Sequence, residues 1–255
     1  MIFITDLWLE EPTLTKVAKD KRLQGKFFVF DHHKSALEEN LNRYDFTTIR
    51  VFDERGLCSG TSLFYEYLTK QGFLPKEENA IQEFSELTRR YDTWEWKTKY
   101  DDERPQELTL LFDSVGCEGY IKLMIEKLRD KSTKFEFNEL EEMLIANKKQ
   151  QVLEKLKNYA RKITYKEITG LKAGIVFIDY EYRNDLAEYF RKQNLNVDFV
   201  MLISLDNGTI SYRNIKDNVN VRLIAEAMGG KGHDYAASSP ISEEQKKDLI
   251  RVLVK

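Results

Sequence analysis

The feature that most constrains the fold is a series of short apolar segments of strand length, which alternate with amphipathic helical patterns. Residues 2–5 and 27–30 are two such segments, and each is followed directly by an aspartate. Between them, residues 11–23 carry a helix-like pattern. Strands that alternate with helices are typical of βαβ units and a parallel sheet. The sequence therefore predicts an α/β fold.

A second alternation of strands and helices follows a long helical stretch. Helical patterns run over residues 61–68 and 81–91, and the chain is almost wholly helical from residue 120 to 163. Strand-like segments then recur at residues 173–178 and 197–205. We expect two lobes: a parallel-sheet domain over residues 1–118, a helical connector over 119–165 and a smaller α/β domain over 166–255. The lysines of the connector indicate either a solvated helix face or a surface that faces phosphate.

The composition limits the partners that the chain would bind. Its 255 residues include 40 basic and 43 acidic side chains, so the net charge of −3 gives no overall attraction to nucleic acid or to an anionic membrane. The longest apolar runs, such as residues 199–203, are much shorter than a membrane span. The sequence opens with no secretory-signal pattern, and its two cysteines indicate no disulfide framework. We expect a cytoplasmic protein with no membrane partner.

Potential metal ligands stand where predicted strands end. Asp31, His32 and His33 directly follow the segment at 27–30, and Asp6 follows the first segment. The carboxyl ends of parallel strands meet at the edge where open α/β sheets bind their ligands. Imidazole and carboxylate groups without thiolates suit Mn²⁺ better than a structural zinc. Two other interpretations stay open, namely Asp6 as a helix N-cap and His32 as a hydrogen-bonded core histidine.

Asp92 ends a helical pattern and is surrounded by aromatic residues. Loop aspartates are mostly solvated or act as caps, so Asp92 alone carries little weight. Trp94 and Trp96 follow it closely. These rings would either stack on nucleic-acid bases or pack inside the protein, and packing is the commoner role.

Four motifs together resemble a known family. The segments T5-D6, D31-H32-H33-K34-S35, Y91-D92-T93-W94-E95-W96 and G229-G230-K231-G232-H233 resemble, in that order, successive motifs of the DHH phosphoesterases. The branch that they resemble most is that of the nano-RNase B type oligoribonucleases. The resemblance extends from Met1 nearly to the end of the chain, and it implies a two-lobed enzyme that contains metal.

The resemblance implies roles for the N-terminal motifs. The aspartate that matches Asp6 bridges two Mn²⁺ ions, and those that match His32 and Asp92 complete the shell of the second ion. His33 matches the residue that faces the substrate phosphate, and Asp31 matches a group that supports the histidines. The resemblance thus implies metal ligands at Asp6, His32 and Asp92 and catalytic roles for His33 and Asp31, with Mg²⁺ as an alternative metal.

The C-terminal lobe resembles the DHH-associated substrate-binding domain. Arg213 matches an arginine that binds phosphate, and His233 matches a histidine that reaches the reacting group. The glycines between them in the motif would let backbone N–H groups approach a nucleotide, although a helix C-cap explains Gly229 and Gly230 equally simply. Lys231 departs from the family's all-glycine run. The predicted substrate-binding residues are Arg213, Gly229, Gly230, Gly232 and His233.

A further departure concerns the start of the sequence. Family members normally begin with a strand and a His-x-Asp-x-Asp-Gly loop that supplies most of the first metal site, and the sequence has no such segment. We therefore expect a site for one ion rather than two. A shortened reading frame, a missing piece supplied by another chain and a binding protein without catalysis are three explanations that the sequence leaves open.

The leading hypothesis is a metal-dependent phosphodiesterase that hydrolyses short RNA or DNA oligonucleotides, or linear dinucleotides, to mononucleotides in a crevice between the lobes. Short substrates are favoured because the balanced charge offers no long basic track for a polynucleotide. A catalytically silent nucleotide-binding module and an inorganic pyrophosphatase are the alternatives. Both a monomer and a homodimer are compatible with the sequence.

Overall fold

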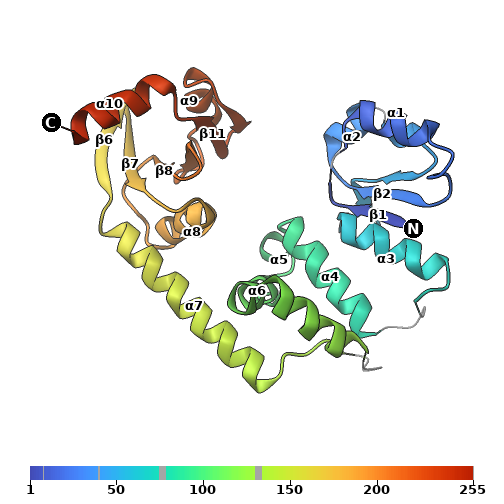
Figure 1. Ribbon diagram of the computed structural model, residues 1–255. Coiled ribbons are helices and arrows are strands. Elements are labelled where there is room, and N and C mark those ends of the chain that lie inside the picture. The colour runs from blue at the N-terminus through green and yellow to red at the C-terminus, as the bar shows by residue number, and fades with distance from the viewer. Residues whose placement is uncertain (8, 40, 75–78, 130–133, 255) are drawn as a thin grey trace. The chain divides into compact units, whose positions relative to one another are not determined.

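The structure is a computed structural model that describes residues 1–7, 9–39, 41–74, 79–129 and 134–254 (Figure 1). It divides into two compact units, Met1–Lys148 and Lys149–Lys255. The division falls within helix α7 (Glu139–Ala160). Both units combine helices with a β-sheet, so the predicted α/β fold class is confirmed. The domain limits predicted at residues 118 and 165 stay predictions.

Unit 1 begins with a three-stranded parallel sheet in the order β1-β2-β3. The strands are β1 (Ile2–Thr5), β2 (Phe27–Asp31) and β3 (Thr47–Ile49). The first two are the apolar segments from which the fold was predicted. Helices α1 (Glu11–Lys19) and α2 (Lys34–Glu38) lie on one face and α3 (Gly60–Lys70) on the other (Figure 1). The sheet is therefore covered on both sides, which is why β2 is apolar along its length.

Two clusters of side chains hold this sheet between its helices. On the face of α1 and α2, Leu14 and Ala36 pack with Phe27 and Val29. On the face of α3, Phe30 and Leu63 form the centre of a cluster that includes several aromatic rings. Phe30 is 1% exposed, so its full burial contributes roughly 1.5–3 kcal/mol to folding. This packing fixes the end of β2, where the histidines follow.

The rest of unit 1 is mainly helical. A short hairpin, β4 (Phe52–Asp53) and β5 (Gly56–Leu57), precedes α3, and η1 (Leu41–Arg43) precedes β3. Helices α4 (Ala80–Asp92), α5 (Glu95–Thr98) and α6 (Arg104–Arg129) follow. Gly116 interrupts α6 with a φ of 72°, a conformation that glycine adopts without a steric cost. The helical connector expected from the sequence corresponds to the end of α6 and to α7.

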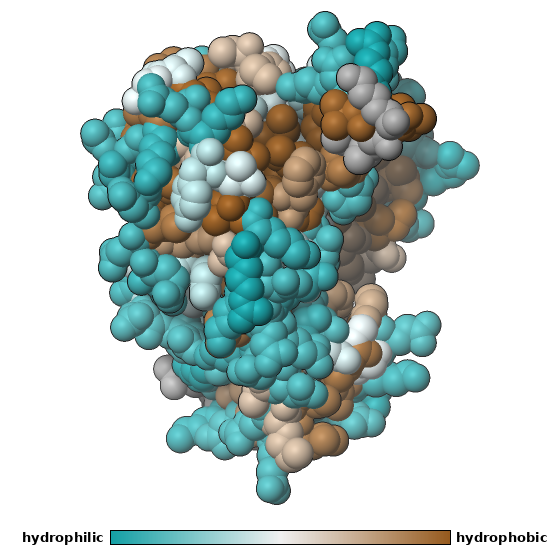
Figure 2. Space-filling view, turned by 90° about the vertical axis from the view of Figure 1, so that its left-hand side faces the viewer, coloured by the Kyte–Doolittle hydropathy of each residue, from teal (hydrophilic) through white to brown (hydrophobic). Residues whose placement is uncertain are grey.

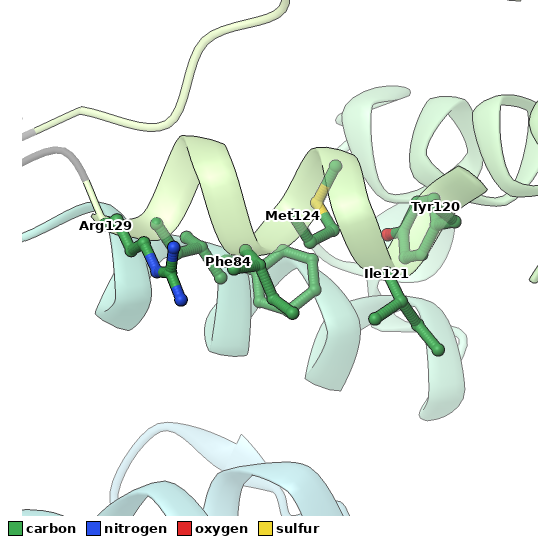
Figure 3. A pocket seen from close by; sticks show the side chains of 7 residues that line it. Phe84, Tyr120, Ile121, Met124 and Arg129 are labelled. Atoms are coloured by element: carbon green, nitrogen blue, oxygen red, sulfur yellow. The ribbon is translucent and has the colours of Figure 1, made fainter. Parts of the chain in front are cut away.

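Helices α4 and α6 form an apolar groove of about 450 Å³ (Figure 3). Phe84 of α4 and the buried Met124 of α6 both line it. None of the predicted site residues lines this groove. Its lining residues are Phe84, Tyr120, Ile121, Met124, Ile125, Leu128 and Arg129.

Unit 2 contains a six-stranded sheet in the order β10-β11-β9-β8-β7-β6. Its strands pair antiparallel except β7 and β8, which are parallel and are joined through η2 (Tyr180–Tyr182) and helix α8 (Arg183–Lys192). The parallel sheet predicted for the first lobe is thus found in unit 1, and unit 2 has a mixed sheet. The strands are β6 (Thr164–Ile168), β7 (Leu171–Phe177), β8 (Phe199–Ser204), β9 (Thr209–Asn214), β10 (Lys231–His233) and β11 (Ala236–Pro240).

Each face of the second sheet has its own core. Helix α8 and the end of α7 pack on one face, where Leu186 and Phe190 contact Val200 and Leu202. Helix α9 (Val221–Ala227) packs on the opposite face with Tyr212. The last helix is α10 (Glu243–Leu253). Because Tyr212 points toward α9, its neighbour Arg213 points toward α8.

The exposed side of α7 is mainly hydrophilic beyond its first turn, where Leu140 and Met143 are exposed. In Figure 2, hydrophilic side chains gather over the lower part of the face shown, where Figure 1 places α7. Lys149, Lys155 and Lys157 are exposed, as a solvated connector predicts, although a phosphate-facing surface has the same exposure. Within the described residues, the longest helices are too polar to cross a membrane.

Candidate metal centre and phosphate-binding residues

Asp6 follows β1 directly and has a left-handed backbone conformation. Its φ is 58°, in a region where aspartate and asparagine are more frequent than most residues. Its backbone N–H donates to the carbonyl oxygen of Phe30 at 2.9 Å, which continues the pairing of β1 with β2. The carboxylate therefore stands at the carboxyl edge of the parallel sheet, as predicted.

Gly60 is a residue of this site that the sequence analysis missed. It is the first residue of α3, after the N-cap Ser59. A Cβ atom here would overlap the backbone nitrogen of Asp6, so only glycine allows the helix to approach so closely. The backbone of Gly60 also hydrogen-bonds the Asp6 carboxylate. A glycine directly after an N-cap serine was the signal in the sequence.

His32 lies between two carboxylates. Its Nε2 is 2.9 Å from Oδ1 of Asp6 and 3.1 Å from Oδ2 of Asp92. The hydrogen bonds to Asp6 and then to Asp92 favour the imidazolium and raise the pKa of His32 to about 10, against the opposing effect of burial. In turn, the hydrogen bond from His32 lowers the pKa of Asp6. The structure thus places two of the predicted metal ligands, Asp6 and Asp92, in contact with the third, His32. The group whose ligand atoms all lie within 4.8 Å of one another contains His33 in place of Asp92.

His33 is held by the buried carboxylate of Asp31. The His33 Nδ1 lies 2.6 Å from Oδ1 of Asp31, and the same oxygen accepts the backbone N–H of His32 at 2.8 Å. A carboxylate accepts hydrogen bonds, so Nδ1 of His33 is the donor and Nε2 is left without a proton in the neutral ring. Asp31 is 1% exposed, whereas the His33 side chain is 49% exposed. The buried acid orients an accessible imidazole.

The donor atoms of this cluster fit a divalent metal ion. Ligand atoms from Asp6, His32 and His33 all lie within 4.8 Å of one another. Imidazole nitrogen and carboxylate oxygen are a donor set suited to Mn²⁺, and Mg²⁺ prefers the oxygen ligands. Both open alternatives keep support in the geometry. The Asp6 carboxylate accepts a hydrogen bond from the backbone of Gly60 at the start of α3, although the N-cap residue of that helix is Ser59. His32 is hydrogen-bonded, and its partners are two acidic side chains.

Asp92 is placed by a buried charge network that the sequence analysis did not identify. Arg89, one turn earlier on α4, is 0% exposed. It donates to both carboxylate oxygens of Glu86 at 2.6 and 2.8 Å, to Glu95 and to the carbonyl oxygen of Leu57 at 2.6 Å. It therefore ties the end of α4 to α5 and to the hairpin that leads into Gly60. A single guanidinium braces both segments that hold Asp6 and Asp92.

The two tryptophans after Asp92 have different environments. Trp94 has a φ of 62° and is 42% exposed, whereas Trp96 is 8% exposed. Their rings lie 5.5 Å apart in an edge-to-face arrangement. Packing therefore accounts for Trp96, and stacking of a base on Trp94 stays a prediction.

In unit 2, Arg213 lies at the end of β9 and faces α8. Its Nη1 donates to the carbonyl oxygens of Tyr212 at 2.9 Å and Ala237 at 3.3 Å, and its Nη2 donates to Oδ1 of Asn184 at 3.0 Å. Burial, followed by the positive charge of Arg183, lowers the pKa of Arg213 to about 10. The side chain stays cationic at neutral pH and is fixed in one orientation.

His233 and Arg213 lie on the same face of the second sheet. His233 pairs with Ala236 of β11, and Ala236 pairs with Arg213. Directly paired residues of antiparallel strands point to the same side. The two side chains therefore flank a small alanine, with their strands roughly 10 Å apart. His233 also stacks on Tyr235, at 5.7 Å between ring centroids.

The glycine-rich segment owes part of its composition to packing. A Cβ at Gly230 would overlap the carbonyl oxygen of Ser238, and one at Gly232 would overlap the backbone of Ala237. Gly229 has a φ of 73° and lies in open space. It follows α9, whose C-cap is Met228, so the alternative interpretation as a helix C-cap describes Gly229. These glycines let β10 lie against β11, and contact with a nucleotide stays a prediction.

The fold of the chain is that of DHH-domain proteins. The DHH domain of a member of a family of ribosomal proteins superimposes with a TM-score of 0.52 and 16% identity, over 92% of this chain and 64% of that one. A pGpG-specific phosphodiesterase, PggH from Vibrio cholerae, superimposes with a TM-score of 0.46 and 15% identity, over 89% of this chain and 78% of that one. No family model matches the chain.

The sequence comparison is more specific. The chain is 32% identical over 243 residues to oligoribonuclease NrnB of Bacillus subtilis strain 168, a match that covers 95% of this chain and 60% of that protein. The predicted resemblance to the nano-RNase B branch of the DHH phosphoesterases is therefore confirmed. The chain spans 60% of the length of this curated relative.

Proposed function

We propose that the chain is a metal-dependent phosphodiesterase that hydrolyses short oligonucleotides, including linear dinucleotides, to mononucleotides. The observation that carries the proposal is the position of His32 between Asp6 and Asp92 at 2.9 and 3.1 Å. Similarity over 95% of the chain to a protein named an oligoribonuclease supports the substrate class. Mn²⁺ is the proposed ion, with Mg²⁺ as the alternative.

The residues of unit 1 would hold the metal and orient the reacting groups. Asp6, His32 and Asp92 are the proposed ligands, and the ion that they hold would supply an activated water and neutralise charge on the phosphoryl oxygens. His33 would place its Nε2 against a phosphate oxygen, because Asp31 fixes the ring through Nδ1. Protonated at Nε2, the His33 ring would donate a hydrogen bond to that oxygen.

The residues of unit 2 would bind the nucleotide. Arg213 has its Nη1 hydrogens occupied by carbonyl oxygens and one Nη2 bond to Asn184. Its Nε–H and one Nη2–H remain for a phosphate, on one edge of a planar fork. His233 on the same face would contact the nucleotide from the neighbouring strands. The backbone of Gly229, Gly230 and Gly232 belongs to the same proposed subsite.

The test is release of mononucleotide from an RNA dinucleotide with and without Mn²⁺. The variant is Asp6→Asn, because asparagine tolerates the φ of 58° and removes only the charge. Asp206→Asn, in an exposed turn, is the matched control. We expect turnover in the wild type and the control, and a loss of about 10- to 100-fold or more in Asp6→Asn.

Other outcomes point to the alternative functions. Nucleotide binding without turnover in any condition would identify a silent binding module. Faster hydrolysis of pyrophosphate than of the dinucleotide would identify a pyrophosphatase. Equal turnover in Asp6→Asn and the wild type would contradict the proposed metal role of Asp6.

A cytoplasmic location and the oligomeric state complete the proposal. Cell fractionation tests the first. Light scattering of the purified chain distinguishes a monomer from a homodimer.

A further inference from the structure

A second arginine lies beside Arg213 in unit 2. Arg183 is the first residue of α8, next to the Asn184 that accepts a hydrogen bond from Arg213. Its guanidinium carbon lies 3.9 Å from the centroid of the Tyr180 ring, and its Nη1 donates to the Tyr180 carbonyl oxygen at 3.1 Å. Stacking on an aromatic ring and one hydrogen bond hold this guanidinium in place. Two fixed guanidinium groups therefore occupy the same end of α8.

The two arginines have no acidic partner in the described part of the chain. The ion pairs found there include none for Arg183 or Arg213, whereas Arg191 on the same helix pairs with Glu188 at 3.8 Å. Burial is the main cause that lowers the pKa of Arg213, and the nearby positive charge of Arg183 adds to it. Like charges held close together without a counter-charge are unfavourable. A bound anion would remove this repulsion.

The unused donors of the pair match a doubly charged anion. Arg213 keeps two free N–H groups on one edge of its fork, and Arg183 uses one of its five donors on Tyr180. A phosphate monoester carries a charge near −2 and three terminal oxygens. An internal phosphodiester carries one negative charge and two terminal oxygens. The pair of guanidinium groups thus suits the monoester better than the diester.

We propose that Arg183 and Arg213 together bind a terminal phosphate monoester of the oligonucleotide, so that the enzyme prefers a dinucleotide with such a phosphate to the same dinucleotide without it. This inference rests on the proposed function, and it assigns to Arg183 a role that determines substrate specificity. The 5′- and 3′-phosphorylated ends share the same chemistry, and separate substrates distinguish them.

The test compares kcat/KM for three substrates: the diadenosine dinucleotide, its 5′-phosphorylated form and its 3′-phosphorylated form. Arg183→Gln removes the positive charge. Arg183→Lys keeps the charge but lacks the planar guanidinium group. Arg161→Gln is a control at an exposed position. We expect the wild type and the control to prefer one phosphorylated form by about 10- to 100-fold, the range for hydrogen bonds to charged groups.

Arg183→Gln should lose this preference mainly through KM and should keep its kcat/KM for the unphosphorylated dinucleotide within about twofold. Arg183→Lys should recover part of the preference. An equal fall for all three substrates in Arg183→Gln would overturn the proposal, because it would indicate a contact with the internal diester or a folding defect. Absence of any preference in the wild type would overturn it as well.

A binding measurement separates this inference from the proposed function. Calorimetry with AMP and with adenosine, both in the presence of a chelator, reports phosphate binding without turnover. Tighter binding of AMP that is lost in Arg183→Gln would support the site even if the chain hydrolysed no dinucleotide. Equal binding of AMP and adenosine by the wild type would reject the site even if the chain were active.

Discussion

The contacts of His32 predict how metal binding depends on pH. In the metal-free protein its Nε2 lies between Asp6 and Asp92, and these contacts raise its pKa to about 10. A histidine must give up the proton on the ligating nitrogen to bind a metal. If His32 is a ligand as proposed, a divalent ion such as Mn²⁺ would therefore have to displace one proton from it at every pH below about 10. Protonation competes with the metal over the whole neutral range.

The expected size follows from this competition. Each pH unit below the pKa of His32 lowers the apparent association constant about tenfold, so between pH 6.5 and 8.5 the affinity should rise about 100-fold. The folded-state pKa lies above the ordinary value of 6.5. The contribution of His32 to stability is therefore complete below about pH 6.5 and is lost as the pH rises toward 10. Higher pH should weaken the metal-free fold and strengthen metal binding.

Calorimetric titration with Mn²⁺ in two buffers of different ionisation enthalpy measures the effect. At pH 7.5 the difference in apparent binding enthalpy between the two buffers should correspond to about one proton released for each ion bound. His32→Gln is the control and should release none from this site. An affinity that is constant between pH 6.5 and 8.5, with no proton release in the wild type, would show that His32 is not a protonated group displaced by the metal.

Two further predictions concern stability. Arg89→Met should lower the free energy of unfolding by about 3 kcal/mol, because it removes the fully buried partner of Glu86 and Glu95 and leaves them only Arg90 and Lys99. In the same urea titration Arg104→Met, whose side chain is 45% exposed and pairs with Glu83 and Asp102, should lower it by about 1 kcal/mol or less. Equal losses in the two variants would contradict the reasoning. Gly230→Ala should lower the free energy of unfolding by about 2–3 kcal/mol, because the added Cβ would overlap the carbonyl oxygen of Ser238. Gly229→Ala should lower it by about 1–2 kcal/mol, because the added Cβ meets open space and only the positive φ is unfavourable. A thermal unfolding series that ranks these two variants in the opposite order would show that β10 moves away from β11 without a penalty.

The sequence by itself determined the α/β class and the position of the ligands along the chain. The period of the apolar segments identified β1 and β2, and the polar residues that follow them had to lie at one edge because parallel strands end together. Asp6 and His32 were candidates because each follows a predicted strand, whereas the role of Asp92 as a ligand was implied only by the resemblance of its motif to the DHH phosphoesterases. Local patterns of this kind can be seen without knowledge of any distant contact.

Only the tertiary structure decided which groups touch. Several contacts join residues that are dozens of positions apart in the sequence. His32 contacts Asp6 and Asp92, and Gly60 must be small for α3 to approach Asp6. Arg89, on the same helix as Asp92, hydrogen-bonds the backbone of Leu57. In the sequence, Arg183 has no feature that distinguishes it from other charged residues at helix starts. Its proximity to Arg213 is visible only in the fold. The physical reason is that close approach, burial and charge repulsion arise from packing between elements, which the periodicity of one segment does not record.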